Sequence, residues 1–315
     1  MISLRNVTKR FPNASAPAVG ALSLDVEEGE TLVLVGPSGC GKTTALRMIN
    51  RLIEPTSGSI QIGGRETMQM SPVELRRGIG YVIQSVGLLP HRTVGANIET
   101  VPRLLGWDAD RIRQRVAELT DLFDLQEELL ARYPSELSGG QRQRAGVARA
   151  LAANPPIMLM DEPFAAVDPI VRGRLQEQFL DIQARLRKTI VFVTHDVDEA
   201  IVMADRIAIL NVGGVLEQLA PPEEILRAPA NDFVRRFVGS ERTLKRLSLI
   251  HVSDLRLDPP GAAETDGAVV EPSATVREAL DAILAAGASA IRVVDDTGEE
   301  RGVLTLDHIS REVAG

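Results

Sequence analysis

The stretch from Gly36 to Thr44 has the composition of a loop that binds phosphate groups. Four residues separate Gly36 from the triplet Gly41-Lys42-Thr43, which is the spacing of a phosphate-binding loop. Glycines let the backbone turn tightly and point its N–H groups at phosphate oxygens. Lys42 would supply charge to the β- and γ-phosphates, and the Thr43 hydroxyl would ligate Mg²⁺. The nucleotide-binding residues predicted here are Gly36, Pro37, Ser38, Gly39, Cys40, Gly41, Lys42, Thr43 and Thr44.

The residues around this loop supply the context that it needs. The apolar run Thr31–Val35 predicts a buried strand, and Thr44–Asn50 is compatible with a helix. A helix N-terminus after the loop adds positive potential at the phosphates. The chain has only four lysines among 35 basic residues, so a lysine at position 42 indicates a need for a compact charge. The alternative, an ordinary glycine-rich turn, explains less of this context.

A carboxylate pair follows a second apolar run. Ile157–Met160 predicts a strand that leads into Asp161 and Glu162. In this position Asp161 can hold Mg²⁺ directly or through water, and Glu162 can act as general base on water. Alone, the pair could merely cap a helix, but beside a phosphate loop it predicts catalysis.

A thiol-reactive reagent is expected to inactivate the protein through Cys40, with protection by MgATP.

Strands and helices alternate between residues 29 and 210, which predicts an α/β fold with a mainly parallel sheet. Ligands of such sheets bind at the carboxyl ends of the strands. Gln84 and His195, like Lys42 and Asp161, follow predicted strands and are expected to meet there. The remaining strands are predicted at 2–9, 22–26, 59–63, 79–83, 189–194, 206–210 and 215–219. Helices are predicted at 110–125, 142–153, 175–186, 222–227 and 232–238, and two more are predicted to begin at residue 71 and after Asp196.

A second glycine-rich turn, Ser138 to Gln141, precedes a predicted helix and is a second potential anion site. One nucleotide does not need two such loops from one subunit. The sequence therefore favours a role for this loop at the nucleotide of a partner subunit.

Composition excludes several classes of protein. The net charge is −8 with no basic block, and aromatic residues are only 3%, so nucleic-acid binding is not indicated. The single cysteine excludes an internal disulfide and a cysteine-rich metal site. No apolar stretch is long enough to span a membrane, and no signal peptide is recognisable, so a cytoplasmic protein is expected.

The motifs together resemble the ATP-binding subunit of an ATP-binding-cassette (ABC) transporter over residues 1–240. The resemblance implies a P-loop cassette: a mainly parallel sheet with flanking helices, an N-terminal antiparallel part and a helical subdomain at about 85–153. It implies ATP and Mg²⁺ as cofactors, with Thr43, Gln84 and Asp161 as metal ligands. Lys42, Gln84, Glu162 and His195 would be catalytic.

The resemblance also assigns roles to residues outside the phosphate loop. Phe11 is similar to the aromatic that stacks on adenine, although a core position is equally open. His195 matches the switch histidine, and Asp168 ends the D-loop, whose first and third residues, Ala165 and Val167, depart mildly from the family pattern. Leu137, Ser138, Gly139, Gly140 and Gln141 resemble the signature motif, which contacts the ATP of a partner subunit in a head-to-tail homodimer.

Further stretches resemble the quaternary-amine importers, which take up glycine betaine, choline or carnitine; these stretches are 46–58, 81–84, 101–107 and 192–200. The implied partners are membrane permease subunits, which would contact residues 87–94 unless these form only a subdomain loop, and indirectly an extracytoplasmic solute-binding protein. The implied location is the cytoplasmic face of the cell membrane, as a peripheral protein. Two alternatives stay open: an importer of another solute such as an amino acid, and a soluble cassette ATPase of DNA repair or translation, against which the absence of long inserts and basic patches argues.

Residues 241–315 form a linker, 258–267, and a single repeat similar to the cystathionine-β-synthase (CBS) type. A helix is predicted at 276–286, a hairpin at 290–294 and 302–306, and a last helix at 308–313. Because such repeats normally occur in pairs, a lone repeat is expected to leave an apolar face for a partner, the likeliest being the same tail of a second subunit. The residues of that face are Ile283, Leu284, Ile291, Val293, Val303 and Leu306.

Overall fold

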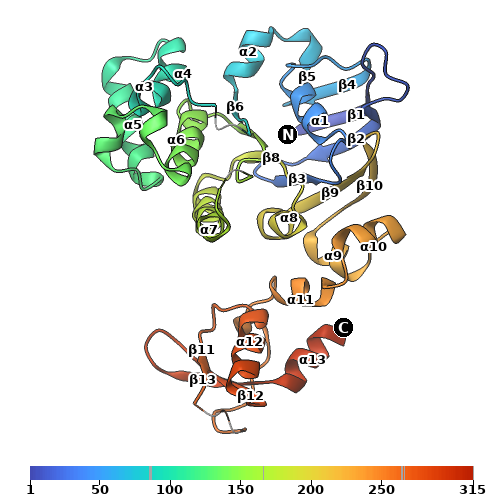
Figure 1. Ribbon diagram of the computed structural model, residues 1–315, viewed down its shortest axis with the longest axis vertical. Coiled ribbons are helices and arrows are strands. Elements are labelled where there is room, and N and C mark those ends of the chain that lie inside the picture. Colours follow the sequence, from blue (N-terminus) through green and yellow to red (C-terminus); the bar gives the residue numbers. More distant parts are fainter. Residues whose placement is uncertain (85–86, 166, 264, 266, 315) are drawn as a thin grey trace. The chain divides into compact units, whose positions relative to one another are not determined.

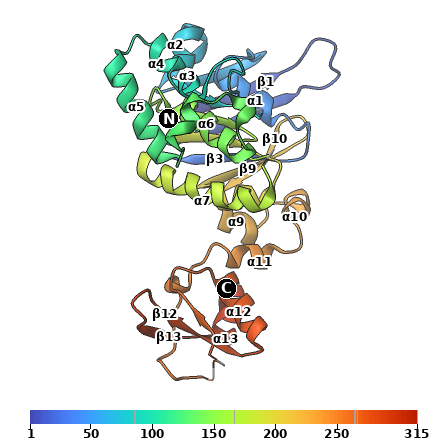
Figure 2. The same cartoon turned by 60° about the vertical axis from the view of Figure 1, so that its left-hand side comes forward.

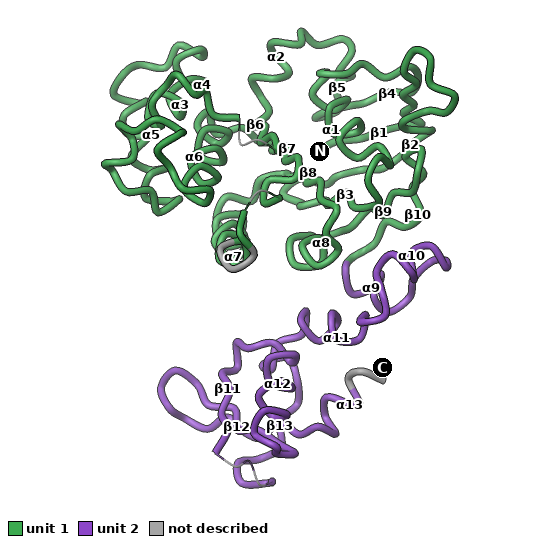
Figure 3. The backbone as a smooth tube through the Cα atoms, in the orientation of Figure 1, with its two compact units in different colours: residues 1–221 green, residues 222–315 purple. Residues whose placement is uncertain are grey.

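The computed structural model describes residues 1–84, 87–165, 167–263, 265 and 267–314, without the side chains of 169–171 and 312–314. The chain forms two compact units, residues 1–221 and 222–315 (Figure 3). This division lies before residue 240, because α9 (Pro222–Arg227) packs against α11 (Arg242–Leu247) in the second unit. No helix in the described residues is both long and apolar enough to cross a bilayer.

A six-stranded sheet forms the centre of the first unit, in the order β10-β9-β3-β8-β7-β6 (Figure 1). All neighbouring strands are parallel except β10, which pairs antiparallel with β9. Every residue of β3, β7 and β8 is buried, as expected for parallel strands covered on both faces. The strands are β3 (Thr31–Val35), β6 (Ile79–Val82), β7 (Ile157–Asp161), β8 (Thr189–Val193), β9 (Arg206–Asn211) and β10 (Val215–Ala220).

A smaller antiparallel sheet packs on the parallel one. Its order is β2-β1-β4-β5, with bounds β1 (Ile2–Lys9), β2 (Val19–Val26), β4 (Ser57–Ile62) and β5 (Arg65–Glu66). One apolar core contains side chains of both sheets and of α1 (Lys42–Ile49). Figure 1 shows α1 on one face of the parallel sheet, with α7 (Pro169–Leu186) and α8 (Val197–Met203) on the other.

The predicted insert is helical, as expected; Figure 1 shows it to one side of the sheets, and in the turned view of Figure 2 its helices lie in front of them. Its helices are α3 (Val94–Ile98), α4 (Thr100–Leu104), α5 (Ala109–Leu122) and α6 (Gly139–Leu151). Two predictions need correction. Helix α6 begins at Gly139 rather than Arg142, because Ser138 caps it. Helix α2 (Pro72–Arg77), predicted from residue 71, begins at Pro72, and Ser71 makes no side-chain cap hydrogen bond.

The second unit, residues 222–315, contains the C-terminal tail, residues 241–315. Helices α9, α10 (Asp232–Val238) and α11 precede a three-stranded sheet of order β11-β12-β13 with two helices. Its predicted hairpin is present as the antiparallel pair β12–β13. The bounds are β11 (Val269–Val270), α12 (Val276–Ala286), β12 (Ala290–Val294), β13 (Glu300–Thr305) and α13 (Leu306–Ala314).

The expectation that the tail leaves an apolar face open was wrong for most of its residues. Four of them are fully buried within the unit, namely Ile283, Ile291, Val293 and Val303, and Leu306 is partly buried. The preceding segment covers them: Leu247 and Val252 are core residues and Leu257 packs against the same core. Only Leu284, 62% exposed, behaves as predicted.

Candidate functional site

The loop from Gly36 to Gly41 joins β3 to α1 and depends on its glycines. Gly36, Gly39 and Gly41 have φ values of 156°, 77° and 106°, which residues with a side chain rarely adopt. A Cβ at Gly36 would lie 2.1 Å from the Leu210 carbonyl oxygen, and one at Gly41 2.3 Å from that of Ala18. The crest of the loop, at Ser38 and Gly39, is exposed. The backbone therefore has the tight curvature that a phosphate loop requires.

Lys42 opens α1 and its side chain turns back over the loop. Its Nζ donates to the carbonyl oxygens of Gly36 at 2.7 Å and Pro37 at 3.1 Å, and lies 3.8 Å from Cys40 Sγ. The side chain is buried, at 6% exposure. A positive charge with three N–H donors is thus held at the centre of the loop, where phosphate oxygens can replace the carbonyl acceptors.

The Thr43 hydroxyl donates to Asp161 Oδ1 at 2.8 Å, so α1 and the end of β7 meet at this pair. Arg47, one turn after Thr43, places Nη2 3.8 Å from Asp161 Oδ2. Burial raises the pKa of Asp161, and the Thr43 hydrogen bond and the Arg47 charge oppose that rise. Adjacent hydroxyl and carboxylate oxygens are the donors that Mg²⁺ prefers, with water and phosphate completing its shell. The pair therefore fits the predicted metal.

Glu162 lies between side chains from the two strands that flank β7. Gln84, after β6, donates from Nε2 to Glu162 Oε2 at 3.2 Å. His195, after β8, places Nδ1 3.2 Å from the same oxygen. Glu162 itself has φ 48°, a strained conformation that is common at functional sites. The prediction that these side chains meet at the carboxyl ends of the strands is confirmed.

A cavity of about 550 Å³ lies beside this cluster. Gln84 and Asp161 both line it, with Arg47, Tyr81 and neighbouring apolar side chains. Sequence analysis missed Arg47 as a site residue. The signal was its spacing, because Thr43 and Arg47 are four residues apart and share one face of α1.

Phe11 lies on the surface and is 40% exposed, so the core alternative was wrong. Lys9 places Nζ 5.3 Å from its ring centroid. An exposed ring with a cation beside it can stack on a planar base.

The second glycine-rich turn lies on the helical subdomain. Ser138 accepts from the Gln141 backbone N–H at 3.3 Å, and the Gln141 side chain accepts from the Ser138 N–H at 2.9 Å. This reciprocal capping box holds the first turn of α6. Leu137 is buried, whereas Gly139 has open space around its Cα. The motif satisfies its side-chain hydrogen bonds internally and leaves its glycine edge accessible.

The D-loop is described in part. Ala166 lies outside the described residues, whereas Asp168 is exposed directly before α7. Its carbonyl oxygen accepts from the Arg172 N–H at 2.8 Å.

Cys40 is not accessible on the surface of the loop. The residue is fully buried and belongs to the apolar core between the two sheets. The expectation that a thiol reagent readily inactivates the protein through Cys40 therefore needs correction, since the buried sulfur is shielded from the reagent.

We expect a maleimide to modify Cys40 slowly in the native chain and rapidly in urea, because only unfolding exposes the thiolate. Mass spectrometry of timed samples measures both rates, with glutathione as the free-thiol control. Native labelling as fast as that of glutathione would contradict the buried position.

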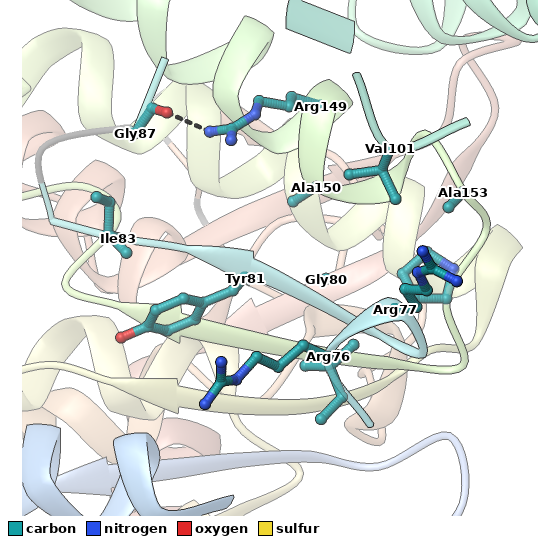
Figure 4. A pocket seen from close by; sticks show the side chains of 12 residues that line it. Arg76, Arg77, Gly80, Tyr81, Ile83, Gly87, Val101, Arg149, Ala150 and Ala153 are labelled. Atoms are coloured by element: carbon teal, nitrogen blue, oxygen red, sulfur yellow. Dashed lines mark hydrogen bonds between the residues drawn. The ribbon is translucent and has the colours of Figure 1, made fainter. Parts of the chain in front are cut away.

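A second cavity, of about 300 Å³, lies between β6, α4 and α6 (Figure 4). Arg149 on α6 donates across it to the Gly87 carbonyl oxygen, and burial lowers the pKa of this arginine. The segment 87–94 begins at Gly87. The Asn97 side-chain amide accepts from the Leu89 N–H and donates to the carbonyl oxygens of Leu89 and Arg92. The segment is therefore a partly buried loop whose backbone is held by hydrogen bonds.

Comparison with known proteins agrees with this geometry. The family model described as ABC transporter matches residues 19–165. The chain is 50% identical to the osmoprotectant import ATP-binding protein OsmV of Salmonella typhimurium, over 96% of this chain and 78% of that protein. It is 48% identical to the glycine betaine/carnitine/choline transport ATP-binding protein OpuCA of Bacillus subtilis, over 99% and 80%.

A solved structure shares the fold. It is the ATP-binding cassette MJ0796 in a dimeric post-hydrolysis state bound to ADP and Pi, 34% identical over 70% of this chain and 99% of that one, with a TM-score of 0.63. Identities of this extent, together with the phosphate loop and the carboxylates beside it, show that the chain belongs to the ABC transporter family as an ATP-binding subunit.

Proposed function

We propose that the chain hydrolyses ATP to drive import of quaternary-amine osmoprotectants such as glycine betaine, choline or carnitine. The observation that carries this proposal is the near full-length identity of 48–50% to ATP-binding subunits of such importers. The geometry agrees, since the phosphate loop and the proposed general base Glu162, with Gln84 and His195 beside it, lie at the carboxyl ends of the parallel strands.

In the proposed mechanism, Lys42 exchanges its carbonyl partners for phosphate oxygens of ATP. Glu162 takes a proton from the water whose oxygen bonds to the γ-phosphorus, the bond from that phosphorus to the β–γ bridging oxygen breaks, and ADP leaves. His195 and Gln84 hold the carboxylate in place from either side. Thr43 and Asp161, with Gln84, would hold Mg²⁺, which supplies positive charge to the phosphates. Phe11 would stack on adenine from the surface.

We further propose that two copies form a head-to-tail dimer, with the Leu137–Gln141 motif of each facing the ATP of the other and Asp168 beside it. The internally capped motif supports this arrangement, because Ser138 is exposed and open space lies where a Cβ of Gly139 would be. The dimeric solved relative bound to ADP and Pi is consistent with it.

The partner in the membrane would be a permease that contacts residues 87–94, and an extracytoplasmic solute-binding protein would deliver the solute. The chain would lie peripherally on the cytoplasmic face. Residues 1–240 would be the ATP-binding domain, and 241–315 a linker and CBS-like repeat. Since that repeat buries most of its own apolar residues, a regulatory role would act through its surface rather than through an open core.

Uptake measurements test the solute. The tagged chain would be purified with its membrane partners and reconstituted in liposomes loaded with MgATP. We expect accumulation of labelled betaine, choline or carnitine with the wild type and none with Lys42→Ala. ATP-dependent uptake of an amino acid, with none of the three amines, would overturn the assignment of the solute class.

A further inference from the structure

A buried carboxylate that the proposed chemistry does not use lies one turn behind the switch histidine. Glu199 on α8 is only 6% exposed. Its Oε1 accepts from Gln176 Nε2 at 3.1 Å. Burying a carboxylate is costly unless hydrogen bonds compensate, so this arrangement needs an explanation.

Both neighbours of His195 make hydrogen bonds that join its turn to the start of α8, and Glu199 lies in the first turn of that helix. Thr194 Oγ1 accepts from the Asp196 N–H at 3.0 Å. The Asp196 carboxylate in turn accepts from the Glu199 N–H at 3.2 Å. His195 thus lies on a turn whose flanking residues are tied into one network.

The same network reaches α7. Besides Gln176, Arg172 one turn earlier lies 3.6 Å from the Asp196 carboxylate. Arg172 also donates to the Val167 carbonyl oxygen at 3.3 Å. Val167 belongs to the loop that follows Glu162, so α7 holds both the histidine turn and the loop after the general base.

We propose that Glu199 and Gln176 are positioning residues that hold His195 beside Glu162. The His195 side chain is 60% exposed, so packing restrains it little and its place depends on the backbone of its turn. Loss of this tie would move the imidazole from its 3.2 Å contact with Glu162. The inference rests on the proposed ATP hydrolysis. It adds Glu199 and Gln176, which do not touch the reacting atoms, to the residues on which the rate depends.

Burial raises the pKa of Glu199, and interactions with the Thr194 and Gln176 side chains oppose that rise. In the hydrogen bond with Gln176, the side chain at position 199 serves as the acceptor. Glutamine keeps the side-chain length and an acceptor oxygen, which makes Glu199→Gln the conservative variant.

Helix α7 offers a matched control. Gln183 lies seven residues after Gln176, hence two turns along the same face. It makes a comparable tie at the other end of β8, with Nε2 donating to the Lys188 carbonyl oxygen at 2.6 Å and Oε1 accepting from its N–H at 3.1 Å. Gln183→Ala removes at least as many side-chain hydrogen bonds as Gln176→Ala, and removes them far from the carboxyl ends of the strands.

The test measures kcat for ATP hydrolysis, the dissociation constant for ATP and thermal unfolding in the full-length chain. We expect Gln176→Ala and Glu199→Ala to lower kcat at least about tenfold, because small misplacements of catalytic groups cost that much or more. ATP affinity should change less than about twofold, since the phosphate loop is untouched. Glu199→Gln should restore most of the rate, and Gln183→Ala should lower stability without lowering kcat.

The inference is overturned if Gln176→Ala and Gln183→Ala reduce kcat alike, or if Glu199→Ala keeps the wild-type rate. Both results would make these contacts merely structural. A wild-type chain without ATPase activity would instead contradict the proposed function, so the two failures are distinguishable.

Discussion

Glu162→Gln is expected to lower the rate of ATP hydrolysis about 10²–10⁴-fold, the usual contribution of a general base, while ATP still binds. The substitution keeps the shape of the side chain and an oxygen that can accept from Gln84 Nε2, which lies 3.2 Å from Glu162 Oε2. It removes the basic electron pair that accepts a proton from water. Because ATP stays bound and uncleaved, the variant should also accumulate as a closed dimer.

Single-turnover assays and size-exclusion chromatography with and without MgATP measure both effects. Glu118→Gln is the control, since Glu118 is half-exposed and pairs with Arg115 on the helical subdomain. Hydrolysis by Glu162→Gln at near the wild-type rate would show that another group activates the water.

The second large effect concerns the composite site. Lys42→Ala should abolish hydrolysis, because it removes the charge held at the centre of the phosphate loop. Ser138→Asp should do the same from the other subunit: aspartate still caps α6, but its charge would face the phosphates of the partner. A mixture of the two inactive variants should recover activity, since one heterodimer interface then combines an intact loop with an intact motif.

Ser138→Asn is the matched control, because it caps equally well without the charge and should retain at least about ten times more activity than Ser138→Asp. Heterodimers can be verified with two affinity tags. Confirmed heterodimers without any recovered hydrolysis would argue against a head-to-tail arrangement in which each site acts alone.

The sequence by itself determined the local structure of the site. The spacing of glycines from 36 to 41 predicted the loop, because few other residues tolerate its positive φ angles. Buried strands β3, β7 and β8 were predictable from continuous apolar runs. The cap at Asp196 was predictable too, since it depends on residues within one turn.

Only the tertiary structure decided which side chains meet. Gln84, Glu162 and His195 are adjacent because β6, β7 and β8 are neighbours in the sheet, and the order of parallel strands is set by packing rather than by local pattern. The contact between Arg47 and Asp161 likewise joins elements more than a hundred residues apart.

Burial was the other property that local pattern could not supply. Cys40 belongs to a loop that looks exposed in sequence, yet the residue is fully buried and belongs to the core that the two sheets share. In the tail, residues that were predicted to need a partner surface are instead covered by Leu247 and Val252 from the preceding segment. Both outcomes follow from the same physical rule: apolar surface is buried against whatever the fold brings near it, and the sequence alone does not say what that is.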